Sequence, residues 1–305
     1  MQNVKRIPLH RYICIHWDLY ALLLPGAILT FIFKYVTMYG LIIAFQDFDI
    51  FDGFLGSKFV GLGHFSKLFC DGYFYQTLWN SFIISFYKLV FTFPLPIILA
   101  ILIHEARVRL FKRCVQTMAY LPHFLSWAIV YGIFYSLLSL DGPVNDIAEA
   151  FGLPRTAFFI SPLAFRSVLV LTDAWKSTGW GCIVYLAALT AVDPSLYEAA
   201  KMDGAGKLQQ IVHITLPSIA PTIVVTLVLR LGSILSAGFD QIFIMYNPTV
   251  YNVADIIDTY VYRLGIGQMD YSYSAAVGLF NSVVSMILVL SSNYAARRWL
   301  GYAMW

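Results

Sequence analysis

The chain has 305 residues, of which 59% are hydrophobic and 12% are charged, and its mean hydropathy is +0.71. Soluble domains carry about 25% charged residues, so this composition excludes an ordinary water-soluble globule. The formal net charge of +3 is too small for the basic surface that binds a nucleic acid backbone. We expect one membrane domain over residues 1–305, with membrane lipid around it and no nucleic acid partner.

Six apolar segments are long enough to cross a hydrocarbon layer about 30 Å thick, which takes roughly 20 residues of helix. The sequence therefore predicts an all-α integral membrane protein with six transmembrane helices. The prolines Pro94, Pro96, Pro122 and Pro221 should bend these helices, either as fixed bends or as hinges. The predicted spans are residues 19–45, 74–103, 114–140, 161–191, 214–236 and 274–296.

Basic residues outside the spans concentrate on one side of the membrane. The connections after spans one, three and five are instead rich in carboxylates. Because positively charged segments stay in the cytoplasm, both termini should be cytoplasmic and these three connections should face outward. The basic residues on the predicted cytoplasmic side are Lys5, Arg6, Arg11, Arg107, Arg109, Lys112, Arg113, Lys201, Lys207, Arg297 and Arg298.

Spans two and four carry ionised side chains, which cost about 2.5–3.5 kcal/mol each at the centre of a membrane helix. In span four, Asp173, Lys176 and Trp180 share one helix face, with Trp175 beside them. Such a stripe indicates a helix face that is turned toward a cavity or a neighbouring helix. Span two shows a similar stripe in Ser81, Ser85, Lys88 and Thr92.

The connection after span four, residues 193–217, is too polar to span a membrane and too regular for coil. Asp193 can cap a helix whose first residue is Pro194. Gly204 and Gly206 should end this helix, and a second amphipathic stretch follows at about residues 207–214. We expect a short helix, a glycine turn and a second short helix at the cytoplasmic surface. In span five, a further polar stripe includes Arg230 and, if the helix continues, Asp240.

The residues of this connection match a known motif at fixed offsets. The pattern resembles, without a gap, the EAA-type loop of the type I permeases of bacterial ABC importers, although an ordinary surface helix is the alternative. Residues 39–48 and 59–65 are similar to the LplB-type branch of carbohydrate permeases. The motif reads Glu198-Ala199-Ala200, three residues, Gly204, nine residues, and Ile214-x-Leu216-Pro217.

The resemblance implies that the motif docks on a cytoplasmic ATPase, which would bind ATP and Mg²⁺. It also implies a second permease subunit, two ATPase subunits, an extracytoplasmic sugar-binding protein and a place in the bacterial cytoplasmic membrane. No cofactor or metal is expected in this chain. The expected coupling residues are Glu198, Ala199, Ala200, Asp203, Gly204, Leu216 and Pro217.

The LplB-type resemblance further implies import of oligosaccharides or polysaccharide fragments. A sugar path needs hydrogen-bonding groups and aromatic faces, which the polar stripes supply. The alternative is a structural role for each residue, such as neutralisation of Asp173 by Lys176 three positions away. The residues hypothesised to line the path are Asp173, Trp175, Lys176, Trp180, Arg230 and Asp240.

Several chemical motifs are missing from the sequence. No segment fits G-x4-G-K-[ST], HExxH or GxSxG, so we expect neither ATP hydrolysis by this chain nor a catalytic site. Two alternatives remain, because the EAA-type loop indicates coupling to an ATPase but does not identify the transported solute. The first is an ABC importer permease for another organic solute, and the second is a proton-coupled transporter or membrane enzyme that uses Asp173 or Asp240.

Overall fold

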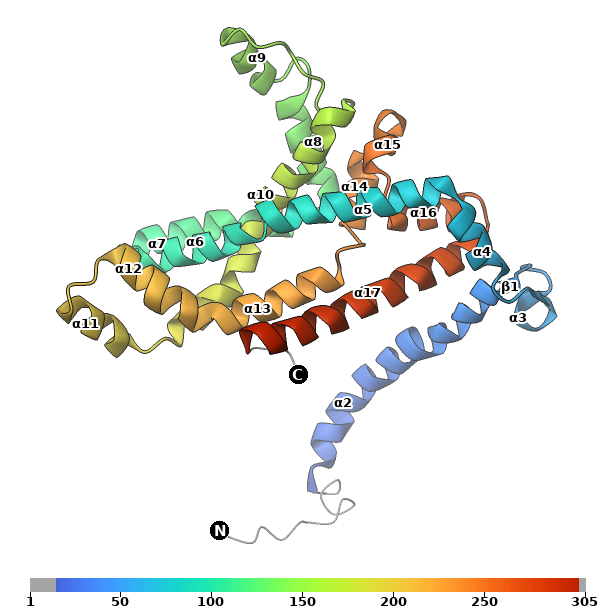
Figure 1. Ribbon diagram of the computed structural model, residues 1–305, viewed down its shortest axis with the longest axis horizontal. Helices are drawn as coiled ribbons and strands as arrows, with labels where there is room; N and C mark the ends of the chain where they lie inside the picture. Colours follow the sequence, from blue (N-terminus) through green and yellow to red (C-terminus); the bar gives the residue numbers. More distant parts are fainter. Residues whose placement is uncertain (1–14, 302–305) are drawn as a thin grey trace.

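The computed structural model describes residues 15–301, which are almost entirely helical (Figure 1). The basic residues Lys5, Arg6 and Arg11 lie outside the described residues. Within residues 15–301, five helical segments are long and apolar enough to cross a membrane. The count rises to six if the bent pair α10 (Pro162–Thr190) and α11 (Pro194–Met202) is taken as one span. This arrangement confirms the predicted all-α membrane architecture.

The first span is one long helical segment on the outside of the bundle. It consists of α2 (Trp17–Thr30), the π-helix η1 (Phe31–Tyr35) and the 3₁₀-helix η2 (Val36–Phe45). No side chain of α2 is buried within the described chain, whereas η2 packs on the C-terminal helix α17 (Tyr271–Leu300). Figure 1 shows α2 diverging from the other helices. An apolar helix of this kind leaves its surface for lipid or another subunit.

The central spans form the packed part of the bundle. The second span contains α5 (Gly72–Phe91) and α6 (Pro94–Glu105), which meet at Thr92 and Phe93. Both helices pack on α10, and α10 in turn packs on α13 (Leu216–Gly232). One buried cluster joins α6, α10 and α13 close to the connection after span four. It contains Ile97, Ala100, Ile101, Ile103, Cys182, Tyr185, Leu189 and Ile219.

The third span differs from the prediction of one helix over residues 114–140. The structure has α7 (Arg109–Tyr120), the 3₁₀-helix η3 (Leu121–Phe124), α8 (Trp127–Leu138) and α9 (Pro143–Ala150). Pro122 lies in the first turn of η3, and Leu125 then takes an extended conformation with ψ 140°. The next helix starts separately, because the hydroxyl of Ser126 accepts a hydrogen bond from the amide of Ile129. The predicted bend at Pro122 is therefore a complete break.

The fifth span also corrects the prediction at both of its ends. α12 (Lys207–Gln210), the π-helix η4 (Ile211–Thr215) and α13 are continuous, so the predicted second surface helix is the beginning of this span. The span ends at Gly232 and not at residue 236. Ala237 and Gly238 then have φ angles of 49° and 92°, a left-handed conformation that a helix cannot continue through. Asp240 consequently lies on a separate helix, α14 (Phe239–Met245).

The connections after spans one and five meet at one end of the bundle, opposite α11 (Figure 1). The first contains strands β1 (Gln46–Asp47) and β2 (Lys58–Phe59), which pair antiparallel, and helices α3 (Gly53–Gly56) and α4 (Gly63–Cys70). The second contains η5 (Pro248–Val250), α15 (Tyr251–Ala254), α16 (Ile257–Tyr262) and the π-helix η6 (Arg263–Gly267). Asp71 links them by accepting hydrogen bonds from the hydroxyls of Tyr260 and Tyr273.

Candidate functional site

The short helix α11 leaves the bundle where the sequence predicts it. The carboxylate of Asp193 accepts a hydrogen bond from the amide of Ser195 at 2.9 Å, and Pro194 is the first helical residue. The axis of α11 is bent by 71° from that of α10. The predicted cap and helix start are both confirmed.

Gly204 ends α11 by adopting a conformation that other residues rarely take. Its φ angle is 78°, and the amide of Ala205 bonds back to the carbonyl of Ala200 at 2.8 Å. A Cβ atom at Gly204 would have no neighbour within 4 Å, so the requirement for glycine comes from the backbone alone. This turn allows the chain to reverse and enter the fifth span.

The motif residues of α11 are largely open to their surroundings. Glu198, Ala199 and Asp203 are exposed, while Ala200 is half-buried. Within the described part of the chain, the carboxylate of Glu198 has no hydrogen bond or ion pair. α11 therefore presents an unpaired negative charge next to small side chains. Of the remaining predicted coupling residues, Leu216 is half-buried and Pro217 is exposed.

Several contacts tie α11 and its turn to the membrane helices. The hydroxyls of Tyr197 and Thr215 are hydrogen-bonded at 3.1 Å. Lys207 forms an ion pair with Glu105 at the end of α6. The side-chain amide of Gln210 donates to the carbonyl of Ala205 at 2.9 Å. A displacement of α11 would therefore be passed to η4, α13 and α6.

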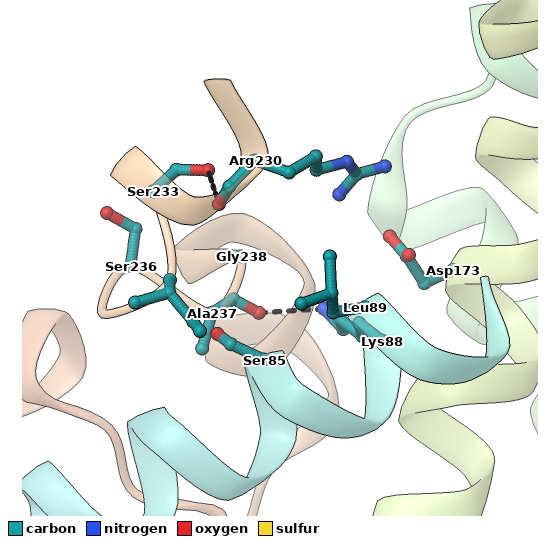
Figure 2. Close-up of a pocket in the computed structure, with 10 residues that line it drawn as sticks. Ser85, Lys88, Leu89, Asp173, Arg230, Ser233, Ser236, Ala237 and Gly238 are labelled. Carbon is teal, nitrogen blue, oxygen red and sulfur yellow. Dashed lines mark hydrogen bonds between the residues drawn. The ribbon is translucent and has the colours of Figure 1, made fainter. Parts of the chain in front are cut away.

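A polar pocket of about 250 Å³ lies between α5, α10 and the end of α13 (Figure 2). It brings together Asp173 and Arg230, two of the residues in the hypothesised sugar path. Figure 2 shows the guanidinium of Arg230 extending toward the side of the pocket where Asp173 lies. The lining residues are Ser85, Lys88, Leu89, Asp173, Arg230, Ser233, Ile234, Ser236, Ala237 and Gly238.

Lys88 belongs to this pocket although it is absent from the hypothesised sugar path. Its Nζ donates to the carbonyl of Ala237 at 2.7 Å and to Oε1 of Gln241 at 2.5 Å. The amide of Gln241 donates in turn to Thr172 Oγ1 at 2.7 Å and to the carbonyl of Leu169 at 2.8 Å. The buried ammonium thus holds the turn after α13 against α5 and α10. The sequence signal was the polar stripe of span two, but the partners became visible only in the fold.

The other residues of the hypothesised path lie outside this pocket. Nζ of Lys176 donates to the carbonyls of His123 and Leu125, at 2.7 and 2.6 Å. Trp180 stacks on the ring of His123 with 4.4 Å between centroids, and Trp175 meets Phe134 edge-on. Lys176 and Trp180 therefore brace the break in the third span, while Trp175 contacts α8 beyond it.

Asp173 and Lys176 of the hypothesised path do not neutralise each other by direct contact, because no ion pair joins them in residues 15–301. Asp240 is exposed on α14. A sugar-lining role for Trp175, Lys176, Trp180 and Asp240 therefore stays a prediction. Over the same described range, no group of three or more His, Cys, Asp or Glu side chains is placed to hold a metal ion.

Comparison with known proteins gives consistent matches. The model of the family described as "binding-protein-dependent transport system inner membrane component" matches residues 92–301. The polygalacturonan/rhamnogalacturonan transport system permease protein YteP of Bacillus subtilis (strain 168) is 47% identical over 92% of this chain and 88% of its own length. Protein LplB of the same organism is 46% identical over the same shares. The resemblance to LplB-type permeases is confirmed.

A solved structure shares both sequence and fold with the chain. It is a chain in the crystal structure of a bacterial alginate ABC transporter in complex with alginate pentasaccharide-bound periplasmic protein. The TM-score is 0.88 and the sequence identity is 41%, with 98% of this chain and 100% of that chain covered. This similarity confirms the predicted permease fold.

Proposed function

Because the chain belongs to the family of binding-protein-dependent transport system inner membrane components, we propose that it imports oligosaccharides or polysaccharide fragments across the bacterial cytoplasmic membrane. It is a multi-pass permease subunit of an ABC transporter and not an enzyme. Membership of this family argues against the two alternatives, a membrane enzyme and a proton-coupled transporter. The names of YteP and of the alginate transporter support a sugar polymer over another organic solute as the cargo.

The observation that carries the coupling part of the proposal is the geometry of α11. This helix is exposed, bent away from α10 and ended by a glycine turn, and it carries Glu198 and Ala199 on its open surface. Small side chains permit close approach of another protein, and an unpaired carboxylate can pair with a basic group on it. α11 is therefore the docking element for a cytoplasmic ATPase.

The working complex in this proposal has two permease subunits, this chain and a related one, over two ATPase subunits. A sugar-binding protein delivers its cargo outside, at the connections that contain α4, α9 and α16. ATP and Mg²⁺ bind to the ATPase subunits, whose closure displaces α11. The contacts of Tyr197 and Lys207 pass that displacement to α13 and α6.

The test is purification of the tagged chain from its native membrane in mild detergent, with identification of the proteins that accompany it by mass spectrometry. We expect an ATPase and a second permease. The double variant Glu198→Lys, Gly204→Val should lose the ATPase, because it reverses the free charge and strains the turn. The second permease should remain bound.

The matched control is Glu149→Lys, which makes the same charge reversal on α9, far from α11 (Figure 1). This variant should retain the ATPase. Recovery of the wild-type chain alone, or equal ATPase retention by the double variant and the control, would contradict the coupling role of α11.

A further inference from the structure

Arg230 carries an unpaired positive charge near the end of the fifth membrane span, and its side chain is exposed in the described chain. It lies two residues before the end of α13. Its guanidinium has no hydrogen bond or ion pair with any part of the chain that the structure describes. It borders the pocket of Figure 2 and also a second cavity of about 450 Å³. An unpaired charge on a membrane-spanning helix is costly, and this one is open to two cavities, so we expect an external partner for it.

The other charged groups of the pocket do not neutralise Arg230. Lys88 adds a second positive charge, and its ammonium is already occupied by Ala237 and Gln241. Asp173 is the one anion in the lining, and it accepts a hydrogen bond from Thr92 Oγ1 at 3.3 Å. No ion pair connects Asp173 to either cation among residues 15–301. The pocket therefore has two cations against one anion, which favours a ligand with negative charge.

The surroundings of Arg230 suit a sugar. Ser233 lines both cavities, and Ser236 adds a further hydroxyl to the first. The second cavity contributes the ring of Phe93 and the hydroxyl of Tyr185, which is hydrogen-bonded to Thr226 at 2.8 Å. Hydroxyls bind the hydroxyls of a sugar, and aromatic rings contact its C–H faces. An anion in these surroundings is best supplied by an acidic sugar.

We propose that Arg230 binds the carboxylate of a uronate residue as the saccharide crosses the membrane. The planar guanidinium presents two parallel N–H donors that match the two oxygens of a carboxylate. The inference rests on the proposed function and narrows its substrate class to acidic saccharides. It assigns Arg230, and not the ammonium of Lys88, as the group that recognises the acid.

The test uses the purified permease–ATPase complex without a binding protein, so that only the permease selects. The probes are trigalacturonate and its fully methyl-esterified form, which differ in charge but not in length. Equilibrium binding is measured by tryptophan fluorescence. The wild type should bind the acid at least about tenfold more tightly than the ester, as expected for hydrogen bonds to a charged group.

Arg230→Gln should reduce that preference to within about twofold, and Arg230→Lys should keep part of it. Arg155→Gln, in the loop after α9, is the matched control and should keep all of it. Each variant must elute as an intact complex. Equal affinity for acid and ester in the wild type, or binding of neither, would overturn the proposal.

Loss of the second permease from the Arg230→Gln complex would also overturn it, since Arg230 would then pair with the other subunit. A failure of the proposed function has a different signature, because no ATPase would accompany the wild-type chain. The two results are therefore distinguishable.

Discussion

Asp255 holds a fully buried negative charge where the connections after spans one and five meet. Its Oδ2 pairs with Nη2 of Arg263 at 2.5 Å and accepts the hydroxyl hydrogen of Tyr73 at 2.6 Å. Its Oδ1 accepts from Thr259 Oγ1 at 2.7 Å. The sequence placed Asp255 and Arg263 in one polar connection but could not pair them, because their approach depends on how α15 and α16 fold back on α5.

Replacing Asp255 by Ala should destabilise the protein by about 3 kcal/mol, since it leaves Arg263 enclosed without its partner. The lower end of the usual range applies because the side chain of Arg263 keeps 27% exposure. Thermal unfolding in detergent measures the change. Asp141→Ala removes an exposed partner of Arg155 at 3.8 Å and should change stability by less than about 1 kcal/mol. Equal effects of the two variants would show that burial of the ion pair is unimportant.

Asp258 gives the end of the bundle opposite α11 a dependence on pH. Burial raises the pKa of its carboxyl above the ordinary value, to about 6. Nδ2 of the neighbouring Asn281 donates to Asp258 Oδ1 at 3.2 Å, and Oδ1 of Asn281 is buried without a partner. Burial disfavours the charged carboxylate, so the folded protein favours the protonated form of Asp258.

The folded protein thus holds a proton on Asp258 in the range from about pH 4 to 6, where the unfolded chain has released it. Stability from this group therefore rises as the pH falls, by about 1 kcal/mol between pH 7 and pH 5. Asp258→Asn should remove this increment, as measured by unfolding at the two pH values. Asp141→Asn, at an exposed position, should retain it. A wild-type increment that survives in Asp258→Asn would contradict the assignment.

At the scale of the helices, length and hydropathy predict where membrane spans occur but not where they are interrupted. Spans one, two, four and six lie within a few residues of their predicted positions, because about 20 apolar residues are the dominant signal. The break after Pro122 depends on Lys176 and Trp180 of another helix, which hold the freed carbonyls and the ring of His123. No local pattern contains that information.

In the candidate site, too, the sequence predicts some of the features and only the fold reveals the others. Helical spacing grouped Asp173 with Lys176 and Trp180, but of the hypothesised path only Asp173 and Arg230 border the pocket. Asp240 was connected to the stripe of Arg230 in span five only by assuming a continuous helix. The helix already ends at Gly232, and the left-handed conformation of Ala237 then keeps α14 separate from it, which an alanine does not predict.

Gly179 sets the distance between α10 and the end of α7. A Cβ atom there would lie 1.8 Å from the carbonyl oxygen of Ala119, so Gly179→Ala must push the two helices apart. We expect a loss of about 1–3 kcal/mol in thermal stability in detergent. Gly278→Ala is the matched control, because a Cβ atom at Gly278 in α17 meets nothing within 4 Å. The control should be neutral or stabilising by about 0.5–1 kcal/mol. A neutral Gly179→Ala would mean that α7 can shift freely.

On the scale of the whole molecule, two polar ends are joined by long apolar helices. One end has the ion pair of Asp255 and the hydrogen bonds of Asp71, and the other has α11 with its ties to α6 and α13. The pocket that contains Arg230 lies between them, where α13 stops and the turn held by Lys88 begins. A movement of α13 that starts at α11 would therefore reach the pocket directly.

The orientation of these ends follows from the distribution of positive charge, and it can be measured. In a variant with Cys14, Cys70, Cys114 and Cys182 replaced, a cysteine at Asp141 or at Arg107 provides one reactive thiol. Both positions are exposed. A membrane-impermeant maleimide should label Asp141→Cys in intact spheroplasts.

Arg107→Cys, in the connection after α6, should be labelled only after the membrane is opened. Labelling of both in detergent is the control for reactivity. The reverse order would place α11 outside the cell, where no ATP-driven subunit operates, and would contradict the predicted topology and the coupling proposal together. The expected order would leave the carboxylate-rich connections outside and make them the surface available to a sugar-binding protein.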